Sequence, residues 1–187
     1  MTTQPTVVER VVLVNALDQE IGTEEKLRAH QLNLMHRAFS VFVVNRGGEF
    51  LLQRRAEQKY HSAGLWSNTA CGHPRPGEPV ATAARRRLRE EMGLDCVLTA
   101  VAHFSYCLAV TDELTENEFD HVFLGVWDGT PNPDPAEVAE WGWRAPERLE
   151  HDLQEHPEHF SRWLPLAWRA LRAASESQPV TLTRQVR

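Results

Sequence analysis

The chain has 187 residues, of which 42% are hydrophobic, and carries a formal net charge of −6 at pH 7. This length and composition fit one globular domain with a full hydrophobic core. An acidic chain lacks the basic face of a general nucleic-acid-binding protein, and no apolar run approaches the roughly 20 residues that cross a bilayer. We therefore expect neither a nucleic-acid partner nor a membrane segment.

The cysteines and the N-terminal residues indicate a compartment. The chain has three cysteines, an odd number, and their spacing does not suggest a disulfide framework. Residues 1–15 lack the basic region and long apolar stretch that are typical of a secretory signal. We expect a cytoplasmic protein.

The first half of the chain predicts strands and one well-bounded helix. Residues 7–15 and 38–45 are rich in β-branched and aromatic residues, and a Gly-Gly turn links the second of these strands to another at 50–55. Residues 64–73 are expected to be irregular to extended. Residues 79–92 begin with proline, contain good helix formers and end before Gly93, which predicts a helix.

The second half predicts shorter strands and then helices. Strands are expected within 96–110 and 121–129, with a brief strand at 141–146. Helices are expected at 146–154 and 157–174, followed by a polar, flexible tail. This order predicts an α+β fold in which a central helix and C-terminal helices pack on a mixed sheet.

The central helix carries a spaced pattern of glycine, arginine and glutamate. Gly72 is followed after five residues by Glu78, and after seven more by the segment RRLREEMGL at 86–94. The pattern resembles the Nudix box. The matching positions are Gly72, Glu78, Arg86, Leu88, Glu90, Glu91, Gly93 and Leu94. A helix with solvent-exposed i,i+4 ion pairs would explain the charges alone, but not the flanking glycines.

One position departs from the box, because Arg87 stands where the pattern has glutamate. In hydrolytic members the helix glutamates hold divalent ions that activate water. Arginine removes a ligand and adds a cation, and Glu91, four residues further on, shares its helix face. This face could hold a metal-bound diphosphate without hydrolysing it.

Four further segments match a narrower group. They are HRAFS at 36–40, LLQRRAEQKYHSAGLWSNTACGHP at 51–74, TENEF at 115–119 and FSRWL at 160–164. With the altered box, they resemble type I isopentenyl-diphosphate isomerase over about residues 7–170. The resemblance implies a single domain over 1–187 with a Nudix core at about 34–166. An N-terminal extension at 1–33 would contribute a strand and a metal ligand, and a flexible tail would cover about 175–187.

The resemblance also implies a reaction. The family interconverts isopentenyl and dimethylallyl diphosphate in isoprenoid biosynthesis by protonating an alkene and deprotonating a neighbouring carbon, which needs an acid and a base. It makes Cys71 the acid, since a free thiol is mostly protonated at pH 7, and Glu118 its partner. Tyr106 lies near Glu118, and Trp163 stabilises the carbocation by cation–π attraction. Cys96 and Cys107 lie in apolar runs and are expected to be buried.

Two metal sites follow from the resemblance. The ligands of one divalent ion, manganese or zinc, would be His30, His36, His73, Glu116 and Glu118. A magnesium ion would bind with the substrate diphosphate to Glu91 and to the backbone carbonyl of Cys71. The five residues between His30 and His36 are one fewer than the family usually has, which leaves His30 the less secure ligand. The histidines expected at the surface are His61, His103, His121, His151, His156 and His159.

The partner implied is a small prenyl diphosphate, bound by cations. The residues at the family's diphosphate positions are Lys26, Arg55, Lys59 and Arg87. We expect Arg54, Arg85 and Arg89 to be solvated. Both a monomer and a homodimer remain open.

Two other functions are consistent with parts of the pattern. A Nudix diphosphate hydrolase would share the box, although Arg87 and Cys71 argue against it. A structural zinc site in an interaction domain could use Cys71 and His73, but no second close pair of ligands follows them.

Overall fold

The structure is a computed structural model and describes residues 8–177. These residues form an α+β fold with nine strands in one mixed sheet, which confirms the predicted class. The strands are β1 Arg10–Val14, β2 Glu20–Glu25, β3 His36–Val44, β4 Phe50–Arg55, β5 Trp66–Ser67, β6 Ala70–Gly72, β7 Leu98–Ala109, β8 Thr115–Val126 and β9 Val138–Arg144. The helices are α1 Lys26–Gln31, α2 Val80–Met92, α3 Pro146–Glu155, the short 3-10 helix η1 Pro157–His159 and α4 Leu164–Ser177.

Strand β3 organises the sheet. It pairs in parallel with β8 along its whole length, from His36 opposite Glu118 to Val44 opposite Val126. Its other edge pairs in turn with β1, β6 and β4, all antiparallel. The long hairpin of β7 and β8 extends the sheet, and β9 adds to β4.

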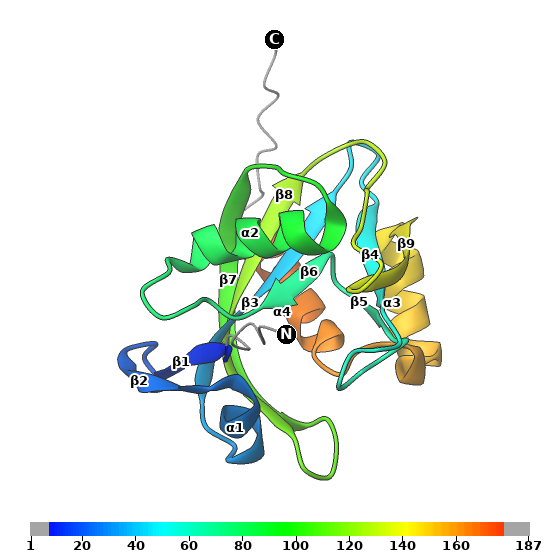
Figure 1. The fold of residues 1–187 in the computed structure, drawn as a ribbon. Coiled ribbons are helices and arrows are strands. Elements are labelled where there is room, and N and C mark those ends of the chain that lie inside the picture. Colours follow the sequence, from blue (N-terminus) through cyan, green and yellow to red (C-terminus); the bar gives the residue numbers. More distant parts are fainter. Residues whose placement is uncertain (1–7, 178–187) are drawn as a thin grey trace, which may run out of the picture.

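Helices cover both faces of this sheet (Figure 1). Residues 38–44 are all buried, as expected for a strand between two layers. On one face α2 packs through Ala83, Ala84, Leu88 and Met92. On the other face α3 and α4 enclose a second core with Phe42, Leu52 and Trp168. The two cores fix β3, β6 and β8, the strands that carry the candidate site.

Helix α2 ends where the sequence predicts. Gly93 adopts a left-handed conformation with φ of 62°, and its N–H bonds to the carbonyl of Arg89. A Cβ atom at Gly93 would lie 2.1 Å from the carbonyl oxygen of Asn132, so only glycine fits there. At the other end, both carboxylate oxygens of Glu78 accept bonds of 2.8 Å from Arg86. These two box residues therefore shape the loop before the helix.

The structure differs from the sequence prediction at four elements. Strand β2 and helix α1 were not predicted, because β2 is acidic and lacks apolar alternation, and pairing with β1 forms it. Strand β8 begins at Thr115, so it includes the TENEF segment. The helix expected at 157–174 is broken, since Phe160 is extended and bridges to Trp66. Residue 7, where the first predicted strand begins, and residues 178–187 of the predicted tail lie outside the described residues.

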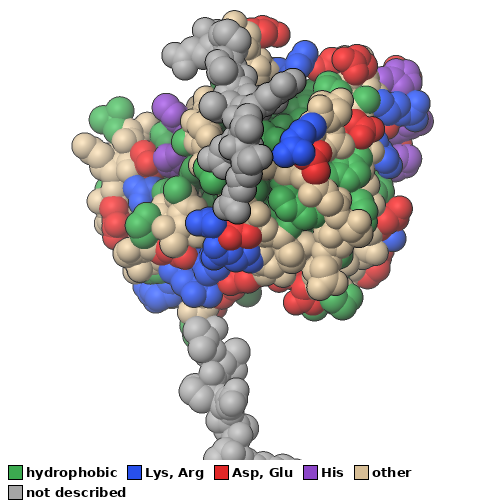
Figure 2. All heavy atoms as spheres, turned by 90° about the horizontal axis from the view of Figure 1, so that it is seen from above, with side chains coloured by type: hydrophobic (Ala, Val, Ile, Leu, Met, Phe, Trp, Pro, Cys, Tyr) green, Lys and Arg blue, Asp and Glu red, His purple; other side chains and the backbone are tan. Residues whose placement is uncertain are grey.

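The surface mixes charges of both signs. Figure 2 shows acidic and basic side chains next to one another on one face of the molecule. Ion pairs such as Arg85 with Asp95, at 2.5 Å, and Arg54 with Glu140, at 3.1 Å, account for part of this mixture. Within residues 8–177, no helix is long and apolar enough to span a bilayer.

Candidate active site and metal centre

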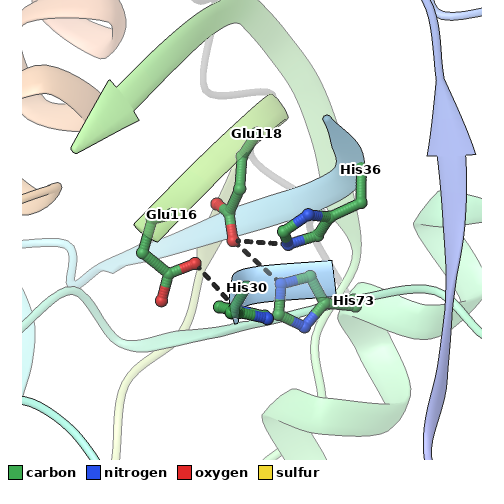
Figure 3. Close-up of side chains that lie close together, drawn as sticks. All are labelled: His30, His36, His73, Glu116 and Glu118. Carbon is green, nitrogen blue, oxygen red and sulfur yellow. Dashed lines mark hydrogen bonds and ion pairs between the residues drawn. The ribbon is translucent and has the colours of Figure 1, made fainter. Parts of the chain in front are cut away.

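Five side chains that could hold a metal ion converge between α1, β3, the loop after β6, and β8 (Figure 3). They are His30, His36, His73, Glu116 and Glu118, and their ligand atoms all lie within 4.8 Å of one another. Two features of the sheet bring them together. The parallel register places His36 opposite Glu118, and alternation along β8 points Glu116 to the same side as Glu118. The short spacing between His30 and His36 still lets His30 join this group, because α1 ends at Gln31 and the chain turns before β3 begins at His36.

The tautomers of two histidines leave lone pairs directed at the carboxylates. Nδ1 of His30 lies 2.6 Å from the carbonyl oxygen of Lys26, and Nδ1 of His36 lies 2.8 Å from that of Leu34. A carbonyl only accepts, so each Nδ1 carries the proton in the neutral ring and each Nε2 is an acceptor.

Both Nε2 atoms face carboxylate oxygens. Nε2 of His30 lies 3.0 Å from Oε2 of Glu116, and Nε2 of His36 lies 3.5 Å from Oε1 of Glu118. Among the described residues, the two Nε2 atoms and Oε2 of Glu116 are buried without a hydrogen-bond partner. Acceptor atoms that face one another repel, and a cation bound between them removes that repulsion. This donor set of imidazoles and carboxylates fits a divalent metal ion.

The two carboxylates are held in different states. Burial, together with the charge of Glu116, raises the pKa of Glu118 to about 7. Burial also opposes ionisation of Glu116, but the N–H of protonated His30 and that of His61 outweigh this effect and hold the pKa of Glu116 well below its usual range. Oε1 of Glu118 lies 2.8 Å from Nε2 of His73. Oε2 of Glu118 accepts a 2.5 Å hydrogen bond from Tyr106.

Cys71 lies on β6 opposite Ser40 of β3, and its side chain lines the same cavity as Glu118 and Tyr106. Burial, together with the negative charge of Glu91, raises the pKa of the thiol to about 12. The guanidinium of Arg55 opposes the shift, with NH1 4.0 Å from Sγ. The thiol is therefore neutral across the physiological pH range and can donate a proton.

Trp163 closes one wall of the cavity. The break between η1 and α4 places it there, because the N–H of Ser161 bonds to the carbonyl of Trp66 at 2.8 Å. The indole Nε1–H donates to Oδ1 of Asn68 at 3.2 Å. The amide of Asn68 in turn donates to the carbonyl of Ala70, at 2.7 Å, on the strand that bears Cys71. The buried amide of Asn68 therefore links the indole of Trp163 to β6, the strand that carries Cys71.

The four cations expected to bind diphosphate all line this cavity, whose volume is about 940 Å³. Three of them pair with carboxylates. Lys26 binds Glu9 at 2.9 Å, while Lys59 and Arg87 share one oxygen of Glu137 at 2.5 and 3.0 Å. Glu137 has no motif signal and was missed from the sequence.

Arg55 differs from the other three cations. Only 6% of it is exposed, and no carboxylate within the part of the chain that is described pairs with it. Its Nε is buried without a partner, and its guanidinium lies 5.3 Å from the ring centroid of Trp163. A buried, uncompensated guanidinium at a cavity wall is suited to an anionic ligand.

The comparisons with known proteins agree with this geometry. Residues 34–164 match the Nudix domain family. The chain is 52% identical over 156 residues to isopentenyl-diphosphate Delta-isomerase 1 of Aromatoleum aromaticum, which covers 83% of this chain and 88% of that protein. The chain belongs to the isopentenyl-diphosphate Delta-isomerase family, within the Nudix superfamily. A family member from Serratia proteamaculans is 48% identical over 83% of this chain and 87% of its own.

Solved structures share the fold of this isomerase family member. DR0079 of Deinococcus radiodurans aligns with a TM-score of 0.72 and 23% identity, over 87% of this chain and 99% of its own. A MutT protein of Methanosarcina mazei Go1 aligns with a TM-score of 0.62 and 22% identity, over 77% and 96%. These similarities show the Nudix fold alone.

Three sequence expectations about this isomerase family member are wrong. His61 is not a surface residue, because only 8% of it is exposed and its Nε2 lies 3.1 Å from Oε1 of Glu116. Cys107 is exposed rather than buried, since it lies on the outer side of the alternating strand β7. His121 is half-buried and pairs with Asp18 at 2.9 Å. Cys96 is partly buried against the α2 core, close to expectation.

Proposed function

We propose that this protein interconverts isopentenyl diphosphate and dimethylallyl diphosphate by a 1,3-shift of a proton. Membership of the isomerase family supports this reaction. The observation that carries it is one cavity lined both by a neutral thiol and by a buried carboxylate held between Tyr106 and His73.

In the forward direction Cys71 donates its proton to the terminal alkene carbon. The carbon–carbon double bond supplies the electron pair, which leaves a tertiary carbocation and a thiolate. Glu118 then removes a proton from the carbon next to the cation, and those electrons form the new double bond. The forward step leaves Cys71 as a thiolate and Glu118 protonated, which is the starting state of the reverse reaction with the two roles exchanged. Transfer of that proton from Glu118 back to Cys71, by exchange with solvent, restores the protein for another forward turnover.

The wall of the cavity stabilises the cation. The indole face of Trp163 attracts positive charge without acting as a nucleophile. The hydroxyl of Tyr106 fixes the carboxylate of Glu118 at its Oε2. Asn68 fixes the indole, so the aromatic wall is ordered before substrate arrives.

The diphosphate would be bound by Lys26, Arg55, Lys59 and Arg87. Arg55 supplies a cation that is already unpaired, whereas the other three exchange carboxylate partners for phosphate oxygens. Arginine grips phosphate oxygens in a bidentate manner and lysine acts as a point charge.

Two divalent ions complete the proposed site. His30, His36, His73, Glu116 and Glu118 would hold manganese or zinc. Glu91 and the backbone carbonyl of Cys71 would hold magnesium with the diphosphate. Glu91 faces the cavity and is 2% exposed, bonded to Gln53 at 2.6 Å and to Arg87. When bound, the ions offset the negative charge of the carboxylates and of the diphosphate.

We further propose a single domain over 1–187 with a core at about 34–166, a cytoplasmic location and a small prenyl diphosphate as the substrate. The oligomeric state is either a monomer or a homodimer.

The competing activity is diphosphate hydrolysis. Arg87 argues against it, because arginine stands where the box pattern has a carboxylate ligand, and its guanidinium also pairs with Glu90 at 2.9 Å and Glu137 at 3.0 Å. The test is product analysis after incubation with isopentenyl diphosphate and Mg²⁺. Dimethylallyl diphosphate with no released phosphate supports the proposal, while phosphate or pyrophosphate release would replace it by hydrolysis.

A further inference from the structure

His61 lies in the loop between β4 and β5, inside the segment at 51–74 that also supplies His73 to the proposed metal centre, and it was expected to be a surface histidine. Its ring is nevertheless buried against that centre, with Nε2 3.1 Å from Oε1 of Glu116. This oxygen is not the one that faces His30, which is Oε2. The two oxygens of Glu116 therefore have separate neighbours.

We propose that His61 is a positioning residue that fixes the carboxylate of Glu116 so that one defined oxygen, Oε2, faces the metal centre. This inference rests on the proposed metal centre. Since a carboxylate oxygen accepts, Nε2 of His61 carries the proton and donates it to Oε1. Nδ1 is then the acceptor in the neutral ring, and the hydroxyl of Ser62 lies 3.4 Å from it.

This tautomer separates His61 from His30 and His36. His30 and His36 donate through Nδ1 and present the Nε2 lone pair to the centre. His61 instead presents a protonated Nε2, which has no lone pair for a metal. Among the described residues, the group of five side chains whose ligand atoms lie within 4.8 Å of one another does not include His61.

The surroundings of His61 hold the ring in this orientation. Tyr60 and Trp163 contact it edge-on, with ring centroids at 4.4 and 5.8 Å. Its carbonyl oxygen accepts a 3.3 Å hydrogen bond from Arg55. Ser62 turns the chain in a left-handed conformation, with φ of 50°. One loop residue thus contacts the metal-site carboxylate, the aromatic wall and the buried arginine.

Outer groups that orient a metal ligand typically change affinity by about 10–100-fold when they are removed. We expect that loss when His61 is replaced by phenylalanine, which keeps an aromatic ring but has no donor. Glutamine places an amide N–H at a similar reach, so His61→Gln should restore most of the affinity. His151 is an exposed histidine on α3, and His151→Gln should leave the affinity unchanged.

The experiment is equilibrium dialysis of chelator-treated full-length protein against Mn²⁺, without substrate, for the wild type and these variants. Circular dichroism verifies folding, and His61→Met, which also lacks a donor, replaces His61→Phe if the phenyl ring does not fit. The inference predicts one ion per chain throughout and a dissociation constant about 10–100-fold higher in His61→Phe, within about threefold of wild type in His61→Gln.

The outcomes separate this inference from the function on which it rests. Wild-type affinity in His61→Phe overturns the role of His61 alone, and so does a His61→Gln variant as weak as His61→Phe. Absence of Mn²⁺ binding by the wild-type protein, repeated with Zn²⁺, would overturn the metal centre itself and this inference with it.

Discussion

Glu118 and Tyr106 stand directly opposite each other in the antiparallel pair of β8 and β7, and the tyrosine hydroxyl donates to Oε2 of the carboxylate. Oε1 of the same carboxylate faces His36 and His73. The two oxygens of Glu118 therefore face different partners: Oε1 faces the histidines of the proposed metal centre, and Oε2 faces Tyr106. In the proposed function, this division would let Glu118 serve both as a metal ligand and as a proton-transfer group.

Removing the Tyr106 hydroxyl should slow the chemical step more than it weakens binding. A hydrogen bond to a charged group contributes about 1.5–3 kcal/mol, so kcat of Tyr106→Phe should fall about 10–100-fold with little change in KM. Steady-state kinetics with isopentenyl diphosphate measure both constants. An unchanged kcat would show that the tyrosine does not orient Glu118 during turnover.

Arg55 and Arg54 offer a matched pair of neighbours. Arg55 is buried in the cavity without a carboxylate partner in the described structure, while Arg54 pairs with Glu57 and Glu140 at the surface. Arg55→Gln should raise the inhibition constant of inorganic pyrophosphate about 10-fold or more, because a charge-assisted bond is lost, whereas Arg54→Gln should not. Equal inhibition constants for the two variants would contradict a role of Arg55 in binding the diphosphate.

Asn68 should act on the reaction through Trp163. Its Oδ1 accepts the indole N–H, so Asn68→Ala frees the ring and should lower kcat about 10-fold. In a Trp163→Phe background that N–H is already absent, so adding Asn68→Ala should lower kcat by a smaller factor than it does in the wild type. Double-mutant kinetics compare the effect of Asn68→Ala on kcat in the two backgrounds. The control background is Trp168→Phe, because Trp168 lies on α4 in the core that α3 and α4 enclose. Additive losses in the Trp163→Phe background would exclude this coupling.

The Cys71 thiol should make the protein sensitive to alkali. Its pKa is about 12 in the folded chain against 9.0 for an ordinary cysteine. Below pH 8 the thiol is neutral in both states and contributes no pH dependence. As pH rises above 9 the unfolded chain ionises while the folded chain does not, so stability falls, by about 1 kcal/mol at pH 10.

Urea unfolding at pH 7 and pH 10 measures this loss. Cys71→Ala should lose about 1 kcal/mol less than the wild type between the two values. Cys107→Ala, which removes an exposed thiol, is the matched control. If both variants lose as much stability as the wild type, the thiol is not buried in the way described.

Part of the fold can be predicted from the sequence because local patterns encode it: the helix at 80–92 and the hairpin of β3 and β4 both follow from such patterns. The grouping of three histidines with Glu116 and Glu118 follows from the resemblance to the isomerase family, because no local pattern links residues so far apart in the chain. Strand β2 could not be predicted, since its residues are acidic and form a strand only by pairing with β1. His61 and Glu137 were missed for a related reason, as their roles depend on contacts with residues 55 and 78 positions away.

The most direct test of the account is isomerisation in deuterated water, for the wild type, Cys71→Ala and the control Cys96→Ala, with Mg²⁺ and isopentenyl diphosphate. We predict deuterium in the dimethylallyl diphosphate formed by the wild type and by Cys96→Ala, and at least a 1,000-fold lower rate in Cys71→Ala, about the upper range of general acid catalysis. Labelled product formed by Cys71→Ala at the wild-type rate would contradict the proton-donor role of Cys71, and intact, unlabelled substrate with the metal-replete wild type would contradict the isomerase itself.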